Sequence, residues 1–330
     1  MLNEMNHIPD AFLHAKAEDL HKILPAPTLF HLKGDNPQPL FLCTLLHGNE
    51  TTGLYAIQRL LKKYQNKPLP RAISLFIGNI TAARENQRRL DGQDDYNRIW
   101  PGSHHDGSPE KDMMQTVTNI MKKKKPFASI DIHNNTGKNP HYGCINTLNP
   151  HSLVLASEFS NIAVYFTDPK GVQSSAFSDF CPAVVLECGQ ASDRSGEEHA
   201  LSYLEKILQI EKLSAPDNNH LKLYHTVARV LIPKTISIGD NNDLCLNYEL
   251  EEKNFHPIQP GTEFATIRST KEKQIIVSSE SHEDITDEYM EITGDKILFK
   301  KPVTLSMFTS DERAIRQDCA CYFMEELHIG

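Results

Sequence analysis

The chain has 330 residues, of which 39% are hydrophobic, and its formal net charge is −9. This length suits one large domain with a smaller one. The acidic balance argues against general nucleic-acid binding, and no apolar run approaches the roughly 20 residues of a membrane span. Residues 1–10 lack the basic start and apolar core of a secretion signal. Seven scattered cysteines without a Cys-x-x-Cys motif predict reduced, structural thiols. We therefore expect a cytoplasmic protein without nucleic-acid or membrane partners.

Short apolar runs alternate with helical patterns through the first two thirds of the chain. Predicted strands cover residues 28–32 (as an edge strand), 39–46, 72–77, 127–132, 162–166 and 183–186, and predicted helices cover 9–24, 51–65, 111–125 and 196–211. Strands that alternate with helices form parallel sheets covered on both faces. This region therefore predicts an α/β fold with a mainly parallel mixed sheet flanked by helices.

The pattern changes at residues 213–220, where Ser, Pro, Asp and Asn predict a linker. Beyond it, short strand-like runs follow one another between turns, at 226–232, 263–268, 273–277 and 296–299. We predict an α/β domain over residues 1–213 and a smaller β-rich C-terminal domain over residues 221–330.

The apolar run that begins at Phe41 ends abruptly in His47-Gly48-Asn49-Glu50, and a helical pattern follows at once. His47 and Glu50 would then lie on a strand-to-helix turn, the edge at which open α/β sheets hold ligands. Imidazole and carboxylate together suit zinc. Taken alone, the motif favours a capping glutamate beside a surface histidine over a metal site.

Two further polar residues come directly after predicted buried strands. His133 follows the strand over 127–132, and Glu187 follows the strand over 183–186. Because the carboxyl ends of parallel strands gather at one edge, these residues should converge with His47 and Glu50. Individually, they fit an ordinary strand-end histidine and a capping glutamate. Jointly, three ligands with one open position predict a catalytic zinc site, and Glu187 would be the carboxylate that transfers protons.

A long loop, residues 79–100, is rich in arginine and poor in apolar residues. Its arginines are Arg84, Arg88, Arg89 and Arg98. Guanidinium groups bind carboxylates and stabilise oxyanions, and loops of this length are often functional. The alternative is a solvated surface loop. His104 and His105, which follow it without a strand end, are interpreted as surface residues.

Together, these motifs resemble one known family. His47-Gly48-Asn49-Glu50, the loop from Asn79 to Arg98, Asp131-Ile132-His133 and Glu187-Cys188-Gly189 resemble the succinylglutamate desuccinylase/aspartoacylase family, a branch of the zinc-carboxypeptidase-like metallohydrolases. The resemblance covers about residues 38–210 in order, and the β-rich tail resembles the family's C-terminal domain. It implies that His47, Glu50 and His133 bind one zinc ion per chain and that Glu187 is the catalytic carboxylate.

The resemblance also assigns residues of the loop. Asn97 and Arg98 match the family's Asn-Arg pair, which grips the substrate carboxylate. Arg88 matches the oxyanion-stabilising arginine, although the loop is about two residues longer than is usual. Arg89 or Arg84 could therefore hold that role instead.

The implied function is a zinc-dependent amidohydrolase that cleaves the linear amide of a small N-acyl amino acid. Aspartoacylases carry another arginine ten residues before the catalytic glutamate, where this chain has Phe177. We therefore expect an N-succinyl or similarly acidic substrate, as in bacterial desuccinylases, instead of strict N-acetylaspartate specificity. The alternatives are a zinc carboxypeptidase acting on small peptides and a metal-binding homologue without catalysis. The oligomeric state is left open.

Overall fold

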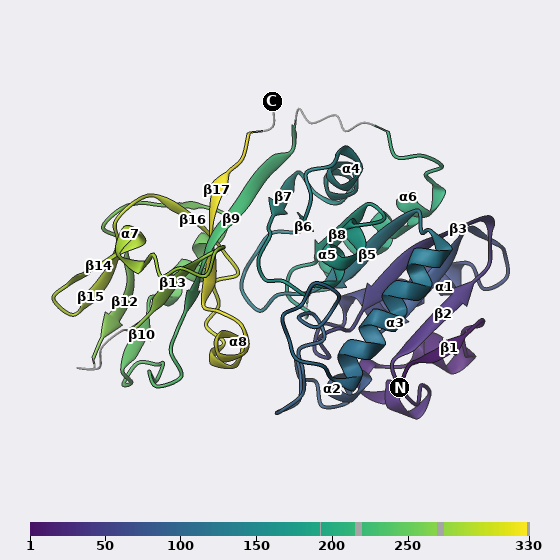
Figure 1. Ribbon diagram of the computed structural model, residues 1–330, viewed down its shortest axis with the longest axis horizontal. Helices are drawn as coiled ribbons and strands as arrows, with labels where there is room; N and C mark the ends of the chain where they lie inside the picture. The colour runs from purple at the N-terminus through teal and green to yellow at the C-terminus, as the bar shows by residue number, and fades with distance from the viewer. Residues whose placement is uncertain (192, 215–219, 269–273, 329–330) are drawn as a thin grey trace. The chain divides into compact units, whose positions relative to one another are not determined.

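The structure is a computed structural model that describes residues 1–191, 193–214, 220–268 and 274–328. It divides into two compact units (Figure 1). The first contains Met1–Asn134 and His141–Lys222, and the second contains Asn135–Pro140 and Leu223–Gly330. The division after Lys222 falls just beyond the predicted linker, of which residues 215–219 lie outside the described part. The segment Asn135–Pro140 differs from the expected boundaries, because it belongs to the second unit.

A mixed sheet forms the centre of the first unit. Its strands lie in the order β1 (Asn3–Met5), β2 (Thr28–Leu32), β4 (Leu69–Ile77), β3 (Gly34–Thr44), β5 (Ala128–His133), β8 (Ala183–Glu187), β6 (Tyr142–Ile145) and β7 (Ile162–Tyr165). β4, β3, β5 and β8 run parallel to one another, whereas β2 and β6 are antiparallel to their neighbours β4 and β8. The predicted mixed α/β fold is confirmed, and the carboxyl ends of β3, β5 and β8 share one edge.

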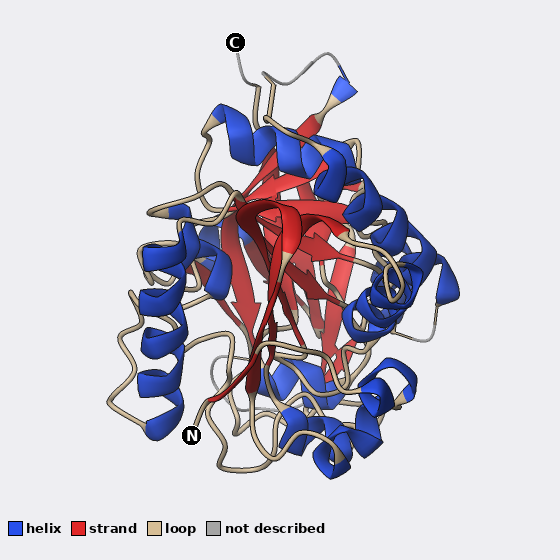
Figure 2. Cartoon of the chain, turned by 90° about the vertical axis from the view of Figure 1, so that its right-hand side faces the viewer, coloured by secondary structure: helices blue, strands red, loops and turns tan. Residues whose placement is uncertain are grey.

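Helices cover the sheet of the first unit on both sides (Figure 2). They are α1 (Thr52–Lys63), α2 (Ile80–Arg84), α3 (Pro109–Lys124), α4 (Pro150–Phe159), α5 (Gln173–Ser178) and α6 (Arg194–Gln209). α1 packs against α6, where Arg59 pairs with Glu197 and Glu198. Four buried side chains of α3, from Met113 to Met121, pack with Phe41 and Cys43 of β3. No described helix is both long enough and apolar enough to span a membrane.

Three local predictions in this unit are wrong. The helix expected over residues 9–24 is two 3-10 helices, Asp10–His14 and Ala17–Lys22, because the backbone between them is extended at Ala15 and Lys16. β2 is not an edge strand, because β1 pairs with it in parallel. The arginine-rich loop begins with the short helix α2, which Asn79 caps by accepting a hydrogen bond from Ala82 N.

The second unit is built from two sets of strands. The first set contains, in order, β9 (Lys222–Leu231), β17 (Cys321–Glu326), β16 (Val303–Ser306) and β11 (Pro257–Ile258), and β13 (Ile276–Ser279) pairs with the other side of β9. The second set contains, in order, β10 (Leu244–Leu246), β12 (Glu263–Ile267), β15 (Lys296–Phe299) and β14 (Met290–Thr293). Its short helices are a 3-10 helix (Tyr248–Lys253), α7 (Thr286–Tyr289) and α8 (Glu312–Gln317). Phe264 contacts both Phe299 and Phe308 edge-on in the core of this unit. The expected strand start at Lys273 lies outside the described residues.

The segment Asn135–Pro140 is tied into the second unit by close contacts. Asn139 Oδ1 accepts a hydrogen bond from Met307 N at 2.9 Å. Gly137 approaches the carbonyl oxygen of Phe308 so closely that a Cβ atom there would come within 2.2 Å of it. Only glycine permits that approach.

Candidate metal centre

The turn after β3 carries His47 and Glu50. The strand ends at Thr44, and Leu45 has a φ of 56°, which turns the chain away from the sheet. Gly48 then passes against α2 so closely that a Cβ atom would lie 2.1 Å from Ala83 N. Glycine is required there by contact with the neighbouring backbone. The turn brings the side chains of His47 and Glu50 to the same side, as the motif predicts.

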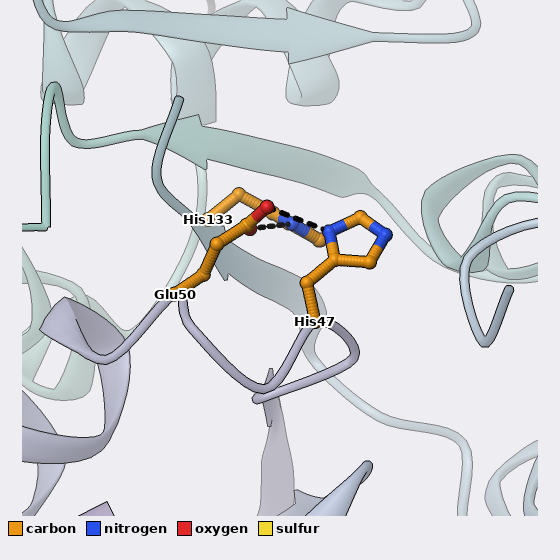
Figure 3. Close-up of side chains that lie close together, drawn as sticks. All are labelled: His47, Glu50 and His133. Atoms are coloured by element: carbon orange, nitrogen blue, oxygen red, sulfur yellow. Dashed lines mark hydrogen bonds and ion pairs between the residues drawn. The ribbon is translucent and has the colours of Figure 1, made fainter. Parts of the chain in front are cut away.

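His47, Glu50 and His133 form one buried cluster (Figure 3). Each offers a potential ligand atom, and these atoms all lie within 4.8 Å of one another. His47 Nδ1 is 2.7 Å from Glu50 Oε1, and His133 Nδ1 is 2.7 Å from Glu50 Oε2. The same nitrogen of both rings therefore faces one carboxylate, so the three residues predicted to bind the metal lie together.

The opposite nitrogen, Nε2, of each imidazole lies against a further carboxylate, a different one for each ring. Neither of these two aspartates was assigned a role from the sequence. His47 Nε2 lies 3.0 Å from Asp95 Oδ1, and His133 Nε2 lies 2.9 Å from Asp131 Oδ2. Asp131 stands two residues before His133 in β5, and alternation along a strand puts both on one face. That spacing was a signal in the sequence. The partner of His47 comes from the distant loop, where no spacing rule reveals it.

The three carboxylates and two rings are coupled electrostatically. Burial alone would raise the pKa of Glu50, but the charges of His47 and His133 hold it below its ordinary value. Burial would likewise raise the pKa of Asp95, yet Arg88 and His47 keep it well below its usual range. For His133, burial would lower the pKa, whereas Asp131 and Glu50 raise it well above normal. The site thus holds concentrated negative charge around two imidazoles.

This donor set fits a divalent metal such as zinc. Two imidazole nitrogens and a carboxylate are ligands that zinc accepts, and three protein ligands are the number found in catalytic zinc sites. Each Nδ1 faces the common carboxylate while each Nε2 is held by another acceptor, which is how metal-binding histidines are usually oriented. The cluster can therefore hold a cation.

Of the three candidate arginines, Arg88 lies nearest the cluster. Its Nη1 is 3.4 Å from Glu50 Oε1, and its Nη2 is 3.1 Å from Asp95 Oδ2. Arg89 donates to the carbonyl oxygen of Gln93, and Arg84 pairs with Glu85 at the surface. Asp95 thus links the guanidinium of Arg88 to the ring of His47.

Asn97 and Arg98 lie beside the cluster on the same loop. Asn97 is buried; its Oδ1 accepts from Gln173 N at 3.0 Å, and its Nδ2 lies 3.4 Å from His133 Nε2. Arg98 is half-buried and donates from Nη1 to the carbonyl oxygen of Asn97. The Asn97 amide therefore contacts both His133 and the start of α5.

Glu187 stands beside His133 in the sheet. The register pairs His133 with Glu187 in β8, and Glu187 with Tyr142 in β6. Paired residues of adjacent strands point to the same face, so the three side chains form one row. Glu187 and Tyr142 are both buried. Sequence reasoning missed Tyr142 because β6 was not predicted.

Phe177 and His105, two other positions considered in the sequence analysis, do not belong to the cluster. Phe177, at the position where the resemblance predicts an arginine in aspartoacylases, is fully buried and stacks on Phe41 with ring centroids 4.5 Å apart. It belongs to the core. His105 is exposed and pairs with Asp94, in keeping with a surface residue.

Comparison with known proteins relates the chain to one family. The model of the succinylglutamate desuccinylase/aspartoacylase catalytic domain matches residues 37–212. A curated succinylglutamate desuccinylase from Pseudomonas aeruginosa is 38% identical over 77 residues, a match that spans only 22% of this chain and 22% of that relative.

Solved structures share the fold. A succinylglutamate desuccinylase from Vibrio parahaemolyticus has a TM-score of 0.62 at 12% identity and covers 97% of this chain and 96% of its own. Murine aminoacylase 3 has a TM-score of 0.60 at 16% identity, covering 90% and 97%. A succinylglutamate desuccinylase from Chromobacterium violaceum has a TM-score of 0.58 at 16% identity, covering 89% and 87%. The family model spans more than half of the chain, and the chain therefore belongs to the succinylglutamate desuccinylase/aspartoacylase family.

Proposed function

We propose that this protein is a zinc-dependent amidohydrolase that cleaves the linear amide of a small N-acyl amino acid, with an N-succinyl or similarly acidic compound as the preferred substrate. The observation that carries the proposal is the position of Glu187, next to His133 in the sheet, beside a cluster able to hold a metal. Membership of a family named for succinylglutamate desuccinylase and aspartoacylase supports the acidic substrate.

His47, Glu50 and His133 would hold one zinc ion per chain. When bound, zinc lowers the pKa of water and polarises a carbonyl group. Glu187 takes the proton from the attacking water and transfers it to the leaving nitrogen, so that the amide nitrogen departs as an amine. The catalytic unit is proposed to be of the zinc-carboxypeptidase type, with the β-rich region as its C-terminal domain.

The arginines supply two different interactions in this scheme. Arg88, held by Asp95 at 3.1 Å, offers its guanidinium to the oxyanion that forms at the scissile carbonyl. Arg98 binds a carboxylate of the substrate through its planar fork, and Asn97 orients that end of the substrate. A cytoplasmic location remains a prediction, in keeping with seven free cysteines.

Glu187→Gln tests this function. The amide keeps the shape of the side chain but cannot accept a proton, so we expect zinc content and fold to survive while kcat for N-succinyl and other N-acyl amino acids falls by about 10²–10⁴. Glu85→Gln, which changes a surface glutamate, should behave as wild type.

An assay against a panel of substrates distinguishes the proposed amidohydrolase from a carboxypeptidase and from a metal-binding homologue without catalysis. It should contain N-succinyl, N-acetyl and longer N-acyl amino acids together with dipeptides. Turnover of dipeptides alone would make the protein a carboxypeptidase. Zinc binding without turnover of any compound would make it a metal-binding homologue. Near-normal activity of Glu187→Gln would remove Glu187 from the reaction, and loss of zinc would make it a ligand.

A further inference from the structure

Asn134 occupies the position directly after the candidate ligand His133, where β5 ends. It is buried, and its backbone N–H donates to Glu50 Oε2 at 3.2 Å. The main chain of this residue therefore holds the carboxylate that both histidines face.

Its side chain reaches two other turns. Asn134 Oδ1 accepts from Thr52 N at 3.2 Å, while Nδ2 donates to Thr52 Oγ1 and to the carbonyl oxygen of Gly189, each at 2.9 Å. The amide orientation follows from these partners, because Thr52 N can only donate and the Gly189 carbonyl can only accept.

The bond from Thr52 N to Asn134 Oδ1 caps helix α1, although Asn134 lies at the end of β5 and not next to α1 in the sequence. Thr51, the residue that precedes α1, makes no side-chain capping bond within the described part of the chain. Unsatisfied amides at a helix start need an acceptor. Asn134 provides one, and α1 begins two residues after Glu50, so the cap also fixes the turn that carries the ligand.

The bond to Gly189 fixes the turn that follows Glu187. This turn has little freedom to vary: Gly189 has a φ of 70°, and Cys188 N donates to the carbonyl oxygen of His133 at 3.0 Å. The Asn134 side chain adds a second bond between the same two strand ends. One amide therefore connects the turn of Glu50 with the turn of Glu187.

We propose that Asn134 is a positioning residue, which sets the separation between the metal-binding turn and the Glu187 turn. The inference rests on the proposed function, because a fixed separation matters only if Glu187 acts on a substrate at the metal. Misplacing reacting groups by about 1 Å can cost on the order of 10²-fold in rate. The ligands themselves are unchanged when the Asn134 side chain is removed.

Asn134→Ala tests this role by removing all three side-chain bonds. We expect a folded protein with the zinc content of wild type, whose kcat falls at least about 10-fold while KM changes little, because orientation and not binding is lost. Hydrogen exchange should become faster at both turns, residues 50–53 and 187–190.

Asn149→Ala is a matched control. Asn149 caps helix α4 in the same manner: its Oδ1 accepts from Ser152 N at 2.8 Å, and its Nδ2 donates to Thr147 Oγ1 at 2.7 Å. Losing this cap should lower the melting temperature without changing kcat. If Asn149→Ala lowers kcat as much as Asn134→Ala does, loss of a cap explains both effects and the proposal fails.

Asn134→Asp decides the case if the alanine variant does not fold. Aspartate keeps the acceptor for Thr52 N, and its second oxygen can accept from the Thr52 hydroxyl, but it cannot donate to Gly189. Exchange should therefore rise mainly at residues 187–190, and kcat should still fall. Normal kcat in a folded Asn134→Asp variant, or unchanged exchange at residues 187–190, would overturn the proposal. Wild-type inactivity toward the whole panel would instead refute the proposed function, and the exchange measurements would still show whether Asn134 joins the turns.

Discussion

Asp131 Oδ2 lies 2.9 Å from His133 Nε2, in a pair whose side chains are 0% and 4% exposed. A buried carboxylate at this position fixes the ring orientation and increases the basicity of the opposite nitrogen, Nδ1. Asp131 would therefore influence metal binding by His133 without being a ligand itself.

Asp131→Asn should therefore weaken metal binding while retaining the shape of the side chain. Loss of such a partner typically costs about 10–100-fold in metal affinity. Competition for zinc with a chromophoric chelator measures the change, and Asp35→Asn, at an exposed aspartate, is the control. An affinity equal to that of wild type would mean that Asp131 only fills space beneath the ring.

Removal of the metal should destabilise the protein. A ligand that binds only the folded state stabilises it by about 2.7 kcal/mol when its free concentration is 100-fold above its dissociation constant. Wild type should contain about one zinc ion by elemental analysis, because the described part of the chain holds one three-ligand set. Its melting temperature should fall on chelation. His133→Ala should contain little zinc and show no response to the chelator; zinc retained in that variant would remove His133 from the site.

Arg98→Lys should reduce the turnover of substrates that carry a free carboxylate more than that of substrates in which this carboxylate is an amide. Lysine keeps the charge but lacks the planar fork that binds a carboxylate with two hydrogen bonds. We expect kcat/KM for N-acyl amino acids to fall about 10-fold or more, because a lost hydrogen bond to a charged group costs roughly 1.5–3 kcal/mol and a tenfold change corresponds to ~1.4 kcal/mol. The corresponding N-acyl amino acid amides should lose far less. Equal losses on both would contradict a carboxylate contact, and Arg84→Lys at the surface is the control.

Thiol labelling should single out Cys245. Burial raises the pKa of Cys43, Cys144, Cys181, Cys188 and Cys321, that of Cys181 to about 12, so their reactive thiolates are scarce, and Cys319 is buried too. Cys245 is only half-buried, although desolvation and Asp240 raise its pKa too. A maleimide at neutral pH should add slowly and once, and faster as the pH rises; mass spectrometry would locate the adduct. Early labelling of Cys43 or Cys188 would show that the first unit opens.

The candidate site residues could be predicted because each depends on a local pattern. His47, His133 and Glu187 all follow a short apolar run, and the parallel-strand rule brings such ends together. The mixed α/β sheet followed from the same periodicity. The helical spacing of apolar residues gave a wrong prediction at residues 9–24, because the backbone there is extended between two short 3-10 helices.

The supporting residues could not be predicted in the same way. Asp95 binds His47 from 48 positions away, and Asn134 reaches Thr52 across 82. Such bonds depend on the three-dimensional packing of loops. Sequence separation of this size carries no periodic signal, so the residues that orient the site became evident only from the structure.

The six residues Asn135–Pro140 make the first unit discontinuous along the chain. The family match at residues 37–212 includes them, although their close contacts, such as Gly137 with Phe308, belong to the other unit. A gene shortened after residue 222 would thus remove the partners of a segment that starts two residues beyond His133. We therefore expect that the C-terminal region cannot be removed or replaced unless the replacement also contacts this segment.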